Sequence, residues 1–361
     1  MTRKLILRDR IWIIIFMGLF FIPPFASKFI NTDINSTENR TLAERPKLSF
    51  ENLGGYSEAY TNYYEDNLPF KQQMVFLYDS IIYQVFNDSS VDSVITGKEG
   101  WLFYNSEVKN DGYTIAEYKR TKQYSEDEMA EIANNVTALR EYIQSMKKEI
   151  VLLIIPNKEE VYSIYMPSKI KVLEYSASCD QLVEYLRDKT DVTVVYPKKE
   201  LMMRATEDEN VRIYQKYDTH WNNLGAVVAV HSLEEAIMGD CKTPETTYKV
   251  IDYSSVDGLS QMLNVAAVLE PEEQYIVPEY QREDKTITSN PNKFNSSVFL
   301  CGDSFRIGLK PFLAADFSRV EEAHRDLLED NQVADSNADI VVLEFVERYV
   351  DQLKTYSFTG E

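Results

Sequence analysis

The chain has 361 residues, of which 44% are hydrophobic and 12% aromatic, so it can bury the core of one large domain or of one domain with an accessory segment. It contains 38 Lys and Arg and 58 Asp and Glu, and the resulting formal net charge of -20 argues against nucleic acid as a partner. The three cysteines, Cys179, Cys241 and Cys301, are odd in number and show no C-x-x-C spacing, which argues against a disulfide framework and a zinc site.

The amino-terminal segment has the pattern of a membrane anchor. An uncharged stretch, residues 11–27, follows a basic flank and reaches the short end of the ~17–25 residues that span a bilayer. The flank predicts a cytoplasmic N-terminus and places everything after residue 30 outside. A cleaved signal peptide is the alternative, but Pro23–Pro24 and Phe25 give no clean cleavage site. We therefore expect a single-pass protein of the cell membrane, with residues 1–30 as tail and anchor. The basic residues of the flank are Arg3, Lys4, Arg8 and Arg10.

Residues 31–90 are predicted to form a polar linker followed by a helical lead-in. The segment 31–55 is polar and punctuated, and short helices are expected near 56–65 and within 66–86. Gly100 then predicts a turn into a strand that starts at Trp101.

From residue 91 onward the pattern is that of one catalytic domain, 91–361, in which helices and strands alternate. Ser125 and Glu128 form a capping-box signature, and apolar residues then recur at steps of three and four to Met146, which predicts a long helix. Continuous apolar runs predict strands that are covered on both faces. The alternation predicts an α/β fold with a mostly parallel sheet. The polar stretch 242–293 predicts a strand-poor insertion or a lid. The predicted strands are 149–156, 191–197, 296–304 and 338–347, and the further helices are 180–189 and 222–238.

Ser304 follows the third of these strands, in the sequence SSVFLCGDSF. Gly302 permits a sharp turn, and Ser304 would lie at the carboxyl end of the strand, where ligands bind in open α/β sheets. The next helix could offer its backbone N–H groups to an oxyanion. The alternative is that Ser304 only caps that helix.

A serine nucleophile needs a base, and His220 is the best candidate. His231 and His324 fall in predicted helices and are typical of ordinary surface residues, whereas His220 directly precedes a helix. Asp218 lies two residues earlier and, in an extended segment, would project to the same side and orient the imidazole. The alternative is a helix cap formed by Asp218 or Asn222. The pattern predicts a catalytic triad of Ser304, His220 and Asp218.

The motifs DTHW and GDSF together resemble the SGNH-hydrolase-like family that includes the alginate O-acetyltransferases and the DHHW proteins. ENRTLAERPKLS, DNLPFKQQ, GKEGWLFY, PNKEEVYSIYMP and ADIVVLEFVERYV are similar to that family's landmarks in the same order, over residues 38–350. The resemblance implies a three-layer α/β/α domain in which Ser304 is the nucleophile, His220 the general base and Asp218 its orienting carboxylate. Thr219 departs from the family because DHHW proteins carry a second His there, and we expect Thr219 to point away from the triad.

The residues that would hold an oxyanion or the substrate are less distinct. No Asn-rich block supplies a side-chain donor, so Asn222, Asn223 or Arg306 could serve. Lys158, Glu347 and Arg348 match family landmarks, and the last two could form an ordinary ion pair. The candidates for oxyanion or substrate contacts are Gly302, Asp303, Trp221, Asn222 and Arg306.

The resemblance implies an extracytoplasmic O-acetyltransferase that acts on an exported or cell-wall polysaccharide through an acetyl-enzyme at Ser304. No acetyl-CoA motif is visible, so the resemblance implies a membrane-bound O-acyltransferase as acetyl donor. The sequence supports no cofactor and no metal, since the three His are scattered. With water as acceptor the same triad would be an acetyl-esterase. A non-catalytic glycan-binding scaffold of an export complex is the third hypothesis.

Overall fold

The computed structural model describes residues 2–26, 42–50, 53–68, 70–207, 212–239, 248–254, 258–269, 273–278 and 294–358. The chain divides into two compact units, Met1–Ile81 and Ile82–Glu361. The second unit holds the parallel sheet and every residue that the sequence proposes for the active site.

The first unit is helical. It contains α1 (Thr2–Ala26), α2 (Leu53–Asp66) and most of α3 (Lys71–Phe86), so the two short helices predicted from the sequence are confirmed. Within the described residues, no helix is both long enough and apolar enough to cross a membrane, so the predicted anchor is not supported. Charged residues occupy the first turns of α1, which shortens its apolar part. These residues are Arg3, Lys4, Arg8, Asp9 and Arg10.

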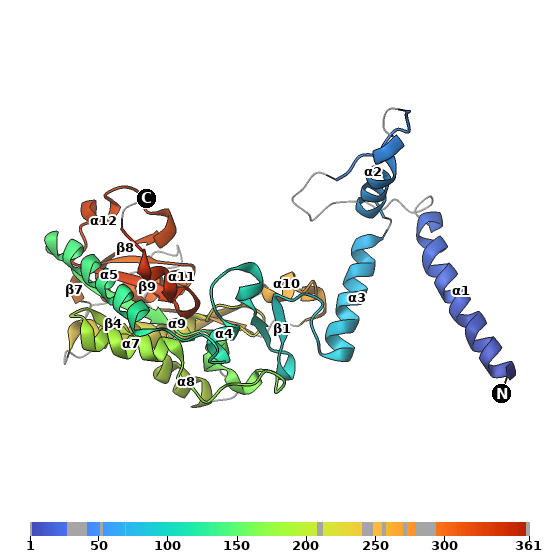
Figure 1. The fold of residues 1–361 in the computed structure, drawn as a ribbon. Helices are drawn as coiled ribbons and strands as arrows, with labels where there is room; N and C mark the ends of the chain where they lie inside the picture. Colours follow the sequence, from blue (N-terminus) through green and yellow to red (C-terminus); the bar gives the residue numbers. More distant parts are fainter. Residues whose placement is uncertain are drawn as a thin grey trace. The chain divides into compact units, whose positions relative to one another are not determined.

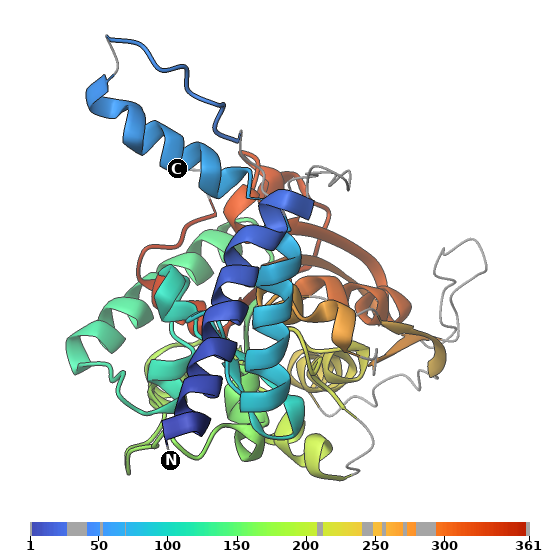
Figure 2. The same cartoon turned by 90° about the vertical axis from the view of Figure 1, so that its right-hand side faces the viewer.

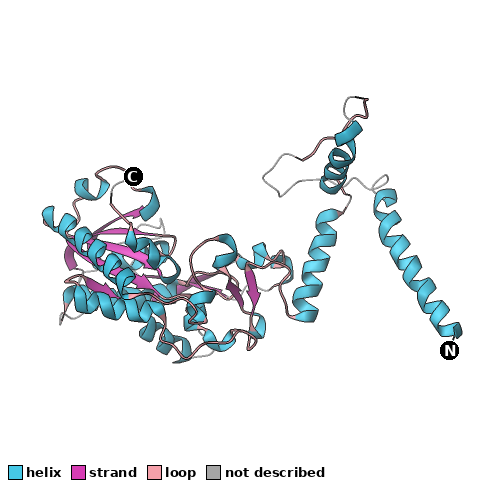
Figure 3. Ribbon diagram, viewed as in Figure 1, coloured by secondary structure: helices cyan, strands magenta, loops and turns pink. Residues whose placement is uncertain are grey.

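A five-stranded sheet forms the centre of the second unit, with the strand order β4-β3-β9-β7-β8 (Figures 1 and 3). All four strand pairings are parallel, and Val151 of β3 pairs with Thr193 of β4 and with Val342 of β9. The four predicted strands and the parallel arrangement are therefore confirmed. The strands are β3 (Glu149–Ile155), β4 (Thr193–Val195), β7 (Phe294–Gly302), β8 (Phe317–His324) and β9 (Ile340–Val346).

The edge strand β8 was not predicted, and the placement of His324 in a helix was wrong. His324 ends β8 and its imidazole accepts a hydrogen bond from the backbone of Asp326. An edge strand has a neighbouring strand on one side only, and most side chains of β8 are exposed or half-buried. Its charged residues therefore lack the continuous apolar run that marked the other strands.

Helices cover both faces of the sheet, which gives three layers (Figure 2, with α5 in green and α9 in yellow). Ile150, Leu152 and Ile154 of β3 pack against α5 and α7, while the alternate residues of β3 pack against the helices of the other face. The first face carries α5 (Glu126–Ser145) and α7 (Ser178–Lys189), and the second carries α8 (Lys198–Glu207), α9 (Asn223–Met238) and α11 (Arg306–Asp316).

The helix α5 confirms the capping box. The Ser125 side chain accepts a hydrogen bond from the backbone N–H of Glu128, whose carboxylate in turn accepts one from the backbone N–H of Ser125. Its apolar stripe is buried against the sheet, so burial and capping both specify this helix. The buried residues of the stripe are Ile132, Ala133, Val136, Leu139 and Ile143.

Two antiparallel ribbons flank the main sheet. Gly100, with φ +76°, makes the predicted turn between β1 (Val94–Thr96) and β2 (Leu102–Tyr104). The described part of 242–293 contains a second ribbon, β5 (Tyr248–Ser254) and β6 (Glu273–Pro278), so the expectation of a strand-poor insertion was wrong there. Cys241 lies outside the described residues, and Cys179 and Cys301 are buried free thiols.

Short helices complete the second unit. They are η1 (Lys98–Gly100), η2 (Ser106–Lys109), α4 (Ile115–Tyr118), α6 (Lys158–Val161), η3 (Ser163–Tyr165), α10 (Leu259–Met262), η4 (Ala266–Val268), η5 (Arg325–Leu327), α12 (Gln332–Asp335) and η6 (Glu347–Lys354).

Candidate active site

Ser304 lies two residues after the end of β7, in the turn that leads into α11, and its side chain is half-buried. Gly302 ends the strand. A Cβ at this position would collide with the carboxylate of Glu344, so glycine is required here for close packing against β9. The backbone of Gly302 is not left-handed, so its role differs from the sharp turn that the sequence suggested.

Asp303 holds this turn from beneath and is buried. Its Oδ1 accepts a hydrogen bond from the backbone N–H of Phe305 at 2.9 Å, and its Oδ2 accepts one from Arg325 Nη1 at 2.8 Å and one from the backbone of Val346 at 3.2 Å. Its own backbone N–H donates to Glu344 Oε2 at 2.9 Å. Asp303 therefore holds the turn that carries Ser304, and both of its carboxylate oxygens are engaged by the protein itself.

Asp218 and His220 lie on a turn that is closed by an antiparallel bridge between Tyr214 and Trp221. His220 Nδ1 lies 2.6 Å from Asp218 Oδ1, and its Nε2 lies 2.6 Å from Ser304 Oγ. The backbone N–H of His220 also donates to Asp218 Oδ1 at 3.0 Å, so a turn joins the two side chains in place of the expected extended segment. The structure thus brings the three predicted residues into one hydrogen-bonded chain.

Two neighbours of Asp218 were misjudged or missed. The hydroxyl of Thr219 lies 3.4 Å from Asp218 Oδ1 and 3.4 Å from His220 Nδ1, so the expectation that it points away was wrong. Gly258, with φ +64°, packs so closely on Asp218 that a Cβ would collide with its carboxylate. Because Gly258 is 40 residues away in sequence and carries no functional group, no signal in the sequence connected it to this site.

The charge of Asp218 sets the tautomer of His220. Burial alone would raise the pKa of this carboxyl, but the hydrogen bonds from His220 and the nearby positive charge of Lys158 hold that pKa well below its ordinary value. Asp218 is therefore ionised at neutral pH and accepts the Nδ1 proton. Nε2 is left as an acceptor for the Ser304 hydroxyl, the arrangement that a general base needs.

Asn222 is already used as a helix cap. Its Oδ1 accepts hydrogen bonds from the backbone of Leu224 at 3.0 Å and of Gly225 at 3.2 Å, and its Nδ2 donates to the Arg212 carbonyl at 2.7 Å. The side chain is also buried. Asn222 is therefore the N-cap of α9, and its amide oxygen and nitrogen are both engaged by the protein itself.

Trp221 and Arg306 support the turn that carries Ser304. The indole N–H of Trp221 donates to the Phe305 carbonyl at 3.2 Å, and the two rings lie 5.4 Å apart. Arg306 Nη1 donates to the Asp303 carbonyl at 2.7 Å, and its Nε lies 3.6 Å from Glu322. Both side chains are therefore engaged by the protein itself.

The backbone of Ser304 offers a donor for an oxyanion. No acceptor for the Ser304 N–H occurs in the described part of the chain. A tetrahedral intermediate on Ser304 Oγ would form next to this group, as in an oxyanion hole built from the nucleophile's own amide.

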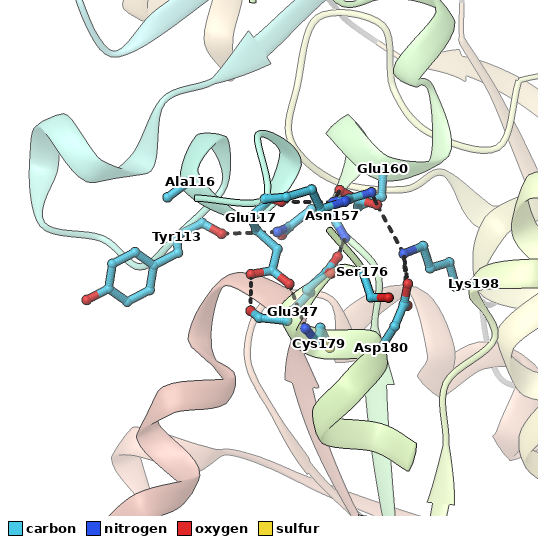
Figure 4. Close-up of polar contacts among 12 residues, drawn as sticks. Tyr113, Ala116, Glu117, Asn157, Glu160, Ser176, Cys179, Asp180, Lys198 and Glu347 are labelled. Carbon is cyan, nitrogen blue, oxygen red and sulfur yellow. Dashed lines mark hydrogen bonds and ion pairs between the residues drawn. The ribbon is translucent and has the colours of Figure 1, made fainter. Parts of the chain in front are cut away.

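A second group of charges lies at the same edge of the sheet, beyond β3 and β9 (Figure 4). Glu160 accepts hydrogen bonds from Arg120 at 2.5 and 2.9 Å and lies 3.0 Å from Lys198. Burial opposes its ionisation, but Arg120 and Lys198 hold the pKa of Glu160 below its ordinary value. Glu117 and Glu347 complete what we name the buried charged cluster: Glu117, Arg120, Glu160, Lys198 and Glu347.

Glu347 is not paired with Arg348 as the sequence allowed. Its Oε2 accepts a hydrogen bond from the backbone N–H of Asn157 at 2.6 Å, and its Oε1 accepts one from the Tyr196 hydroxyl at 3.0 Å. Burial raises the pKa of Glu347 well above its ordinary value. These contacts join the ends of β3, β4 and β9, so the cluster stabilises the carboxyl edge of the sheet.

Comparison with known proteins identifies the family. The family model described as "SGNH hydrolase-like domain, acetyltransferase AlgX" matches residues 94–320, more than half of the chain. The chain belongs to this SGNH hydrolase-like family. The matched range of the SGNH hydrolase-like domain includes Asp218, His220 and Ser304.

Relatives of this SGNH hydrolase-like chain are distant. It is 25% identical to a protein of Pseudomonas putida named "Probable alginate O-acetylase AlgJ". This match extends over 186 residues, which are 51% of this chain and 44% of the relative. The chain thus matches about half the length of the first curated relatives. The solved O-acetyltransferase domain of Pseudomonas putida AlgJ has a TM-score of 0.50 at 20% identity, with coverage of 73% and 99%. Bacillus cereus PatB1 has a TM-score of 0.50 at 15% identity, with coverage of 73% and 99%. These structures support the SGNH-like fold.

Proposed function

We propose that this protein is an O-acetyltransferase that moves acetyl groups to hydroxyls of a polysaccharide through Ser304, His220 and Asp218. The observation that carries the proposal is the hydrogen-bonded chain from Asp218 Oδ1 through His220 to Ser304 Oγ, with 2.6 Å at each contact. The family description names an acetyltransferase, and the relative from Pseudomonas putida is named a probable alginate O-acetylase, which supports the same reaction class.

In the first half-reaction Ser304 is acetylated. Its Oγ attacks the carbonyl carbon of an acetyl ester while His220 Nε2 takes the hydroxyl proton, and Asp218 stabilises the imidazolium. The new O–C bond gives a tetrahedral oxyanion beside the Ser304 N–H. The bond between the acetyl carbon and the donor oxygen then breaks, and His220 returns its proton to that oxygen.

In the second half-reaction a sugar hydroxyl replaces the donor. His220 takes its proton as the sugar oxygen attacks the acetyl carbon, and the bond to Ser304 Oγ breaks as His220 protonates Oγ. Water in place of the sugar gives free acetate and an acetyl-esterase. The acceptor that occupies the site, and the exclusion of water, decide between the two outcomes.

The proposal extends to the place of the reaction. Basic residues before the uncharged stretch 11–27 are typical of segments that direct export, so we propose that the catalytic domain works outside the cytoplasm. Acetyl groups must then be delivered there, and we propose a membrane-bound O-acyltransferase as their donor. The acceptor would be an exported or cell-wall polysaccharide.

Mass spectrometry of the full chain tests this function. The protein is exposed to 4-nitrophenyl acetate with and without candidate oligosaccharides, beside Ser304→Ala. A transient acetyl adduct on Ser304 that passes to sugar supports the transferase. Turnover to acetate at a rate that sugar does not change supports the esterase. No adduct, and no difference from Ser304→Ala, supports the glycan-binding scaffold.

A further inference from the structure

Lys158 is a buried lysine that contacts the turn carrying the triad. It begins α6, three residues after the end of β3, and only 2% of it is exposed. Its Nζ donates to the carbonyl oxygens of Leu102 at 2.6 Å, of Lys216 at 2.9 Å and of Asp218 at 2.9 Å. An ammonium group has three N–H donors, and these three carbonyls match them.

The three carbonyls belong to different parts of the fold. Leu102 starts β2, whereas Lys216 and Asp218 lie on the turn that carries His220. The aromatic rings of Trp101 and Phe103, 5.1 and 5.2 Å from Nζ, screen it from water. One ammonium therefore ties the turn to β2 and to the carboxyl end of β3.

We propose that Lys158 is a positioning residue of the active site, which holds the backbone of Asp218 so that its carboxylate meets His220. The inference rests on the proposed function of Ser304, His220 and Asp218. The carbonyl of Asp218 is fixed by Lys158, and its carboxylate is 2.6 Å from His220 Nδ1. A displacement of about 1 Å costs roughly 10²-fold in rate at a catalytic contact. Lys158 itself is too deeply buried to touch a substrate.

Lys148 provides a matched control at the opposite end of the same strand. It directly precedes β3, is 7% exposed, and donates through Nζ to the hydroxyl of Ser336 at 3.0 Å and to the carbonyl of the same residue. Both lysines are buried ammonium groups that flank β3, but only Lys158 lies at its carboxyl end, on the side of the sheet where Asp218, His220 and Ser304 meet. Loss of Lys148 measures the general cost of removing a buried lysine.

The test compares Lys158→Met with Lys148→Met in the full chain. We expect Ser304 acetylation by 4-nitrophenyl acetate, followed by mass spectrometry, to slow about 10²-fold in Lys158→Met and to stay near the wild-type rate in Lys148→Met. We expect the short contact between His220 Nδ1 and Asp218 to give a strongly deshielded proton in the NMR spectra of the wild type and of Lys148→Met, and this signal should be absent from the spectrum of Lys158→Met. Thermal unfolding of both variants reports stability separately.

Chemical rescue asks whether the ammonium itself is needed. Lys158→Ala removes the equivalent of n-propylammonium, so adding this cation should restore part of the acetylation rate, while 1-propanol should not. Equal effects of both compounds would show that only volume is restored, which would overturn the proposal.

The outcomes separate this inference from the proposed function. A wild-type protein without an acetyl adduct contradicts the proposed function itself. A wild type that reacts, together with Lys158→Met that reacts equally fast and keeps the deshielded proton, overturns the role of Lys158. If Lys158→Met does not fold, Lys158→Arg replaces it. A planar guanidinium cannot direct donors to three carbonyls around one point, so a folded but slow variant is expected and an unchanged rate contradicts the proposal.

Discussion

The carboxyl edge of the parallel sheet carries two groups of charged side chains. Asp218 and His220 approach Ser304 beyond β7, and their side chains are 17% and 33% exposed. The buried charged cluster lies beyond β3 and β9, where the Glu160 side chain is only 3% exposed and contacts Arg120 and Lys198. The two groups lie on one edge but use their charges differently.

The difference lies in what each carboxylate faces. Glu160 faces two cations, which keep it ionised and fix it in place. Asp218 faces an imidazole that also reaches a half-buried serine, so a proton taken up by His220 from Ser304 would be stabilised by the carboxylate. A carboxylate that is paired with two cations therefore favours stability, whereas a carboxylate that contacts an imidazole supports proton transfer.

The largest expected effect comes from breaking the reactive group. Asp218→Asn should slow acetylation of Ser304 about 10⁴-fold, because the amide favours the wrong imidazole tautomer and cannot stabilise the imidazolium. The rate is measured as 4-nitrophenol release and checked by the Ser304 adduct. Asp188→Asn, at a position where the Asp side chain is 72% exposed, is the control and should be unaffected. A loss under tenfold for Asp218→Asn would exclude a triad.

Breaking the buried charged cluster should affect stability and leave the chemistry intact. Arg120→Met leaves Glu160 buried with one cation fewer, and such a loss costs about 3–5 kcal/mol in the free energy of unfolding. Urea unfolding measures the loss, and the folded fraction should acetylate Ser304 at the wild-type rate. The double variant Arg120→Met, Glu160→Gln should recover part of the stability. A slower reaction of the folded fraction of Arg120→Met would show that the buried charged cluster and the group of Asp218, His220 and Ser304 are coupled.

The sequence predicted the parts of the fold that depend on local pattern. The predictions of β3, β7, β9 and α5 were confirmed. A strand that is buried on both faces needs a continuous apolar run, and a helix that buries one stripe needs apolar residues at steps of three and four, so both patterns can be read from the sequence. The edge strand β8 has no continuous apolar run, since its exposed positions can hold charged residues.

The site was only partly predictable for a related reason. Asp218, His220 and Ser304 stand in the short motifs DTHW and GDSF, and these motifs together with the family resemblance led to the predicted triad. The contacts of Asn222 and Arg306 could not be predicted, because their partners, the first turn of α9 and the carbonyl of Asp303, depend on local geometry that residue type does not reveal. Arg325 and Glu344, which hydrogen-bond to Asp303, lie 22 and 41 residues from it in the sequence, so only the tertiary structure shows these contacts.

A buried acid that faces no cation among the described residues sharpens the comparison. Glu234 of α9 is fully buried, and its burial together with the nearby Asp316 raises its pKa to about 9 from an ordinary 4.5. The folded protein thus holds a proton that the unfolded chain releases, so stability is full below pH 4.5 and falls as pH rises towards 9.

Glu234→Gln should remove this slope. The slope approaches about 1.4 kcal/mol per pH unit within that window, so the variant should gain roughly 2–3 kcal/mol on the wild type between pH 6 and pH 8. Urea unfolding at several pH values measures it. Parallel curves for the two proteins would show that Glu234 is ionised in the folded state, as Glu160 is.

The smallest effect is expected for an ion pair with the same chemistry in an exposed position. Glu128 Oε1 lies 2.8 Å from Lys354 Nζ, close to the distances between Glu160 and Arg120, but the Glu128 side chain is 41% exposed. Water and salt screen such a pair, and its two long side chains lose entropy on pairing. Lys354→Ala should cost under ~1 kcal/mol, and 1 M salt should remove most of that cost. A loss as large as that of Arg120→Met would mean that distance, and not burial, decides what a charge contributes in this protein.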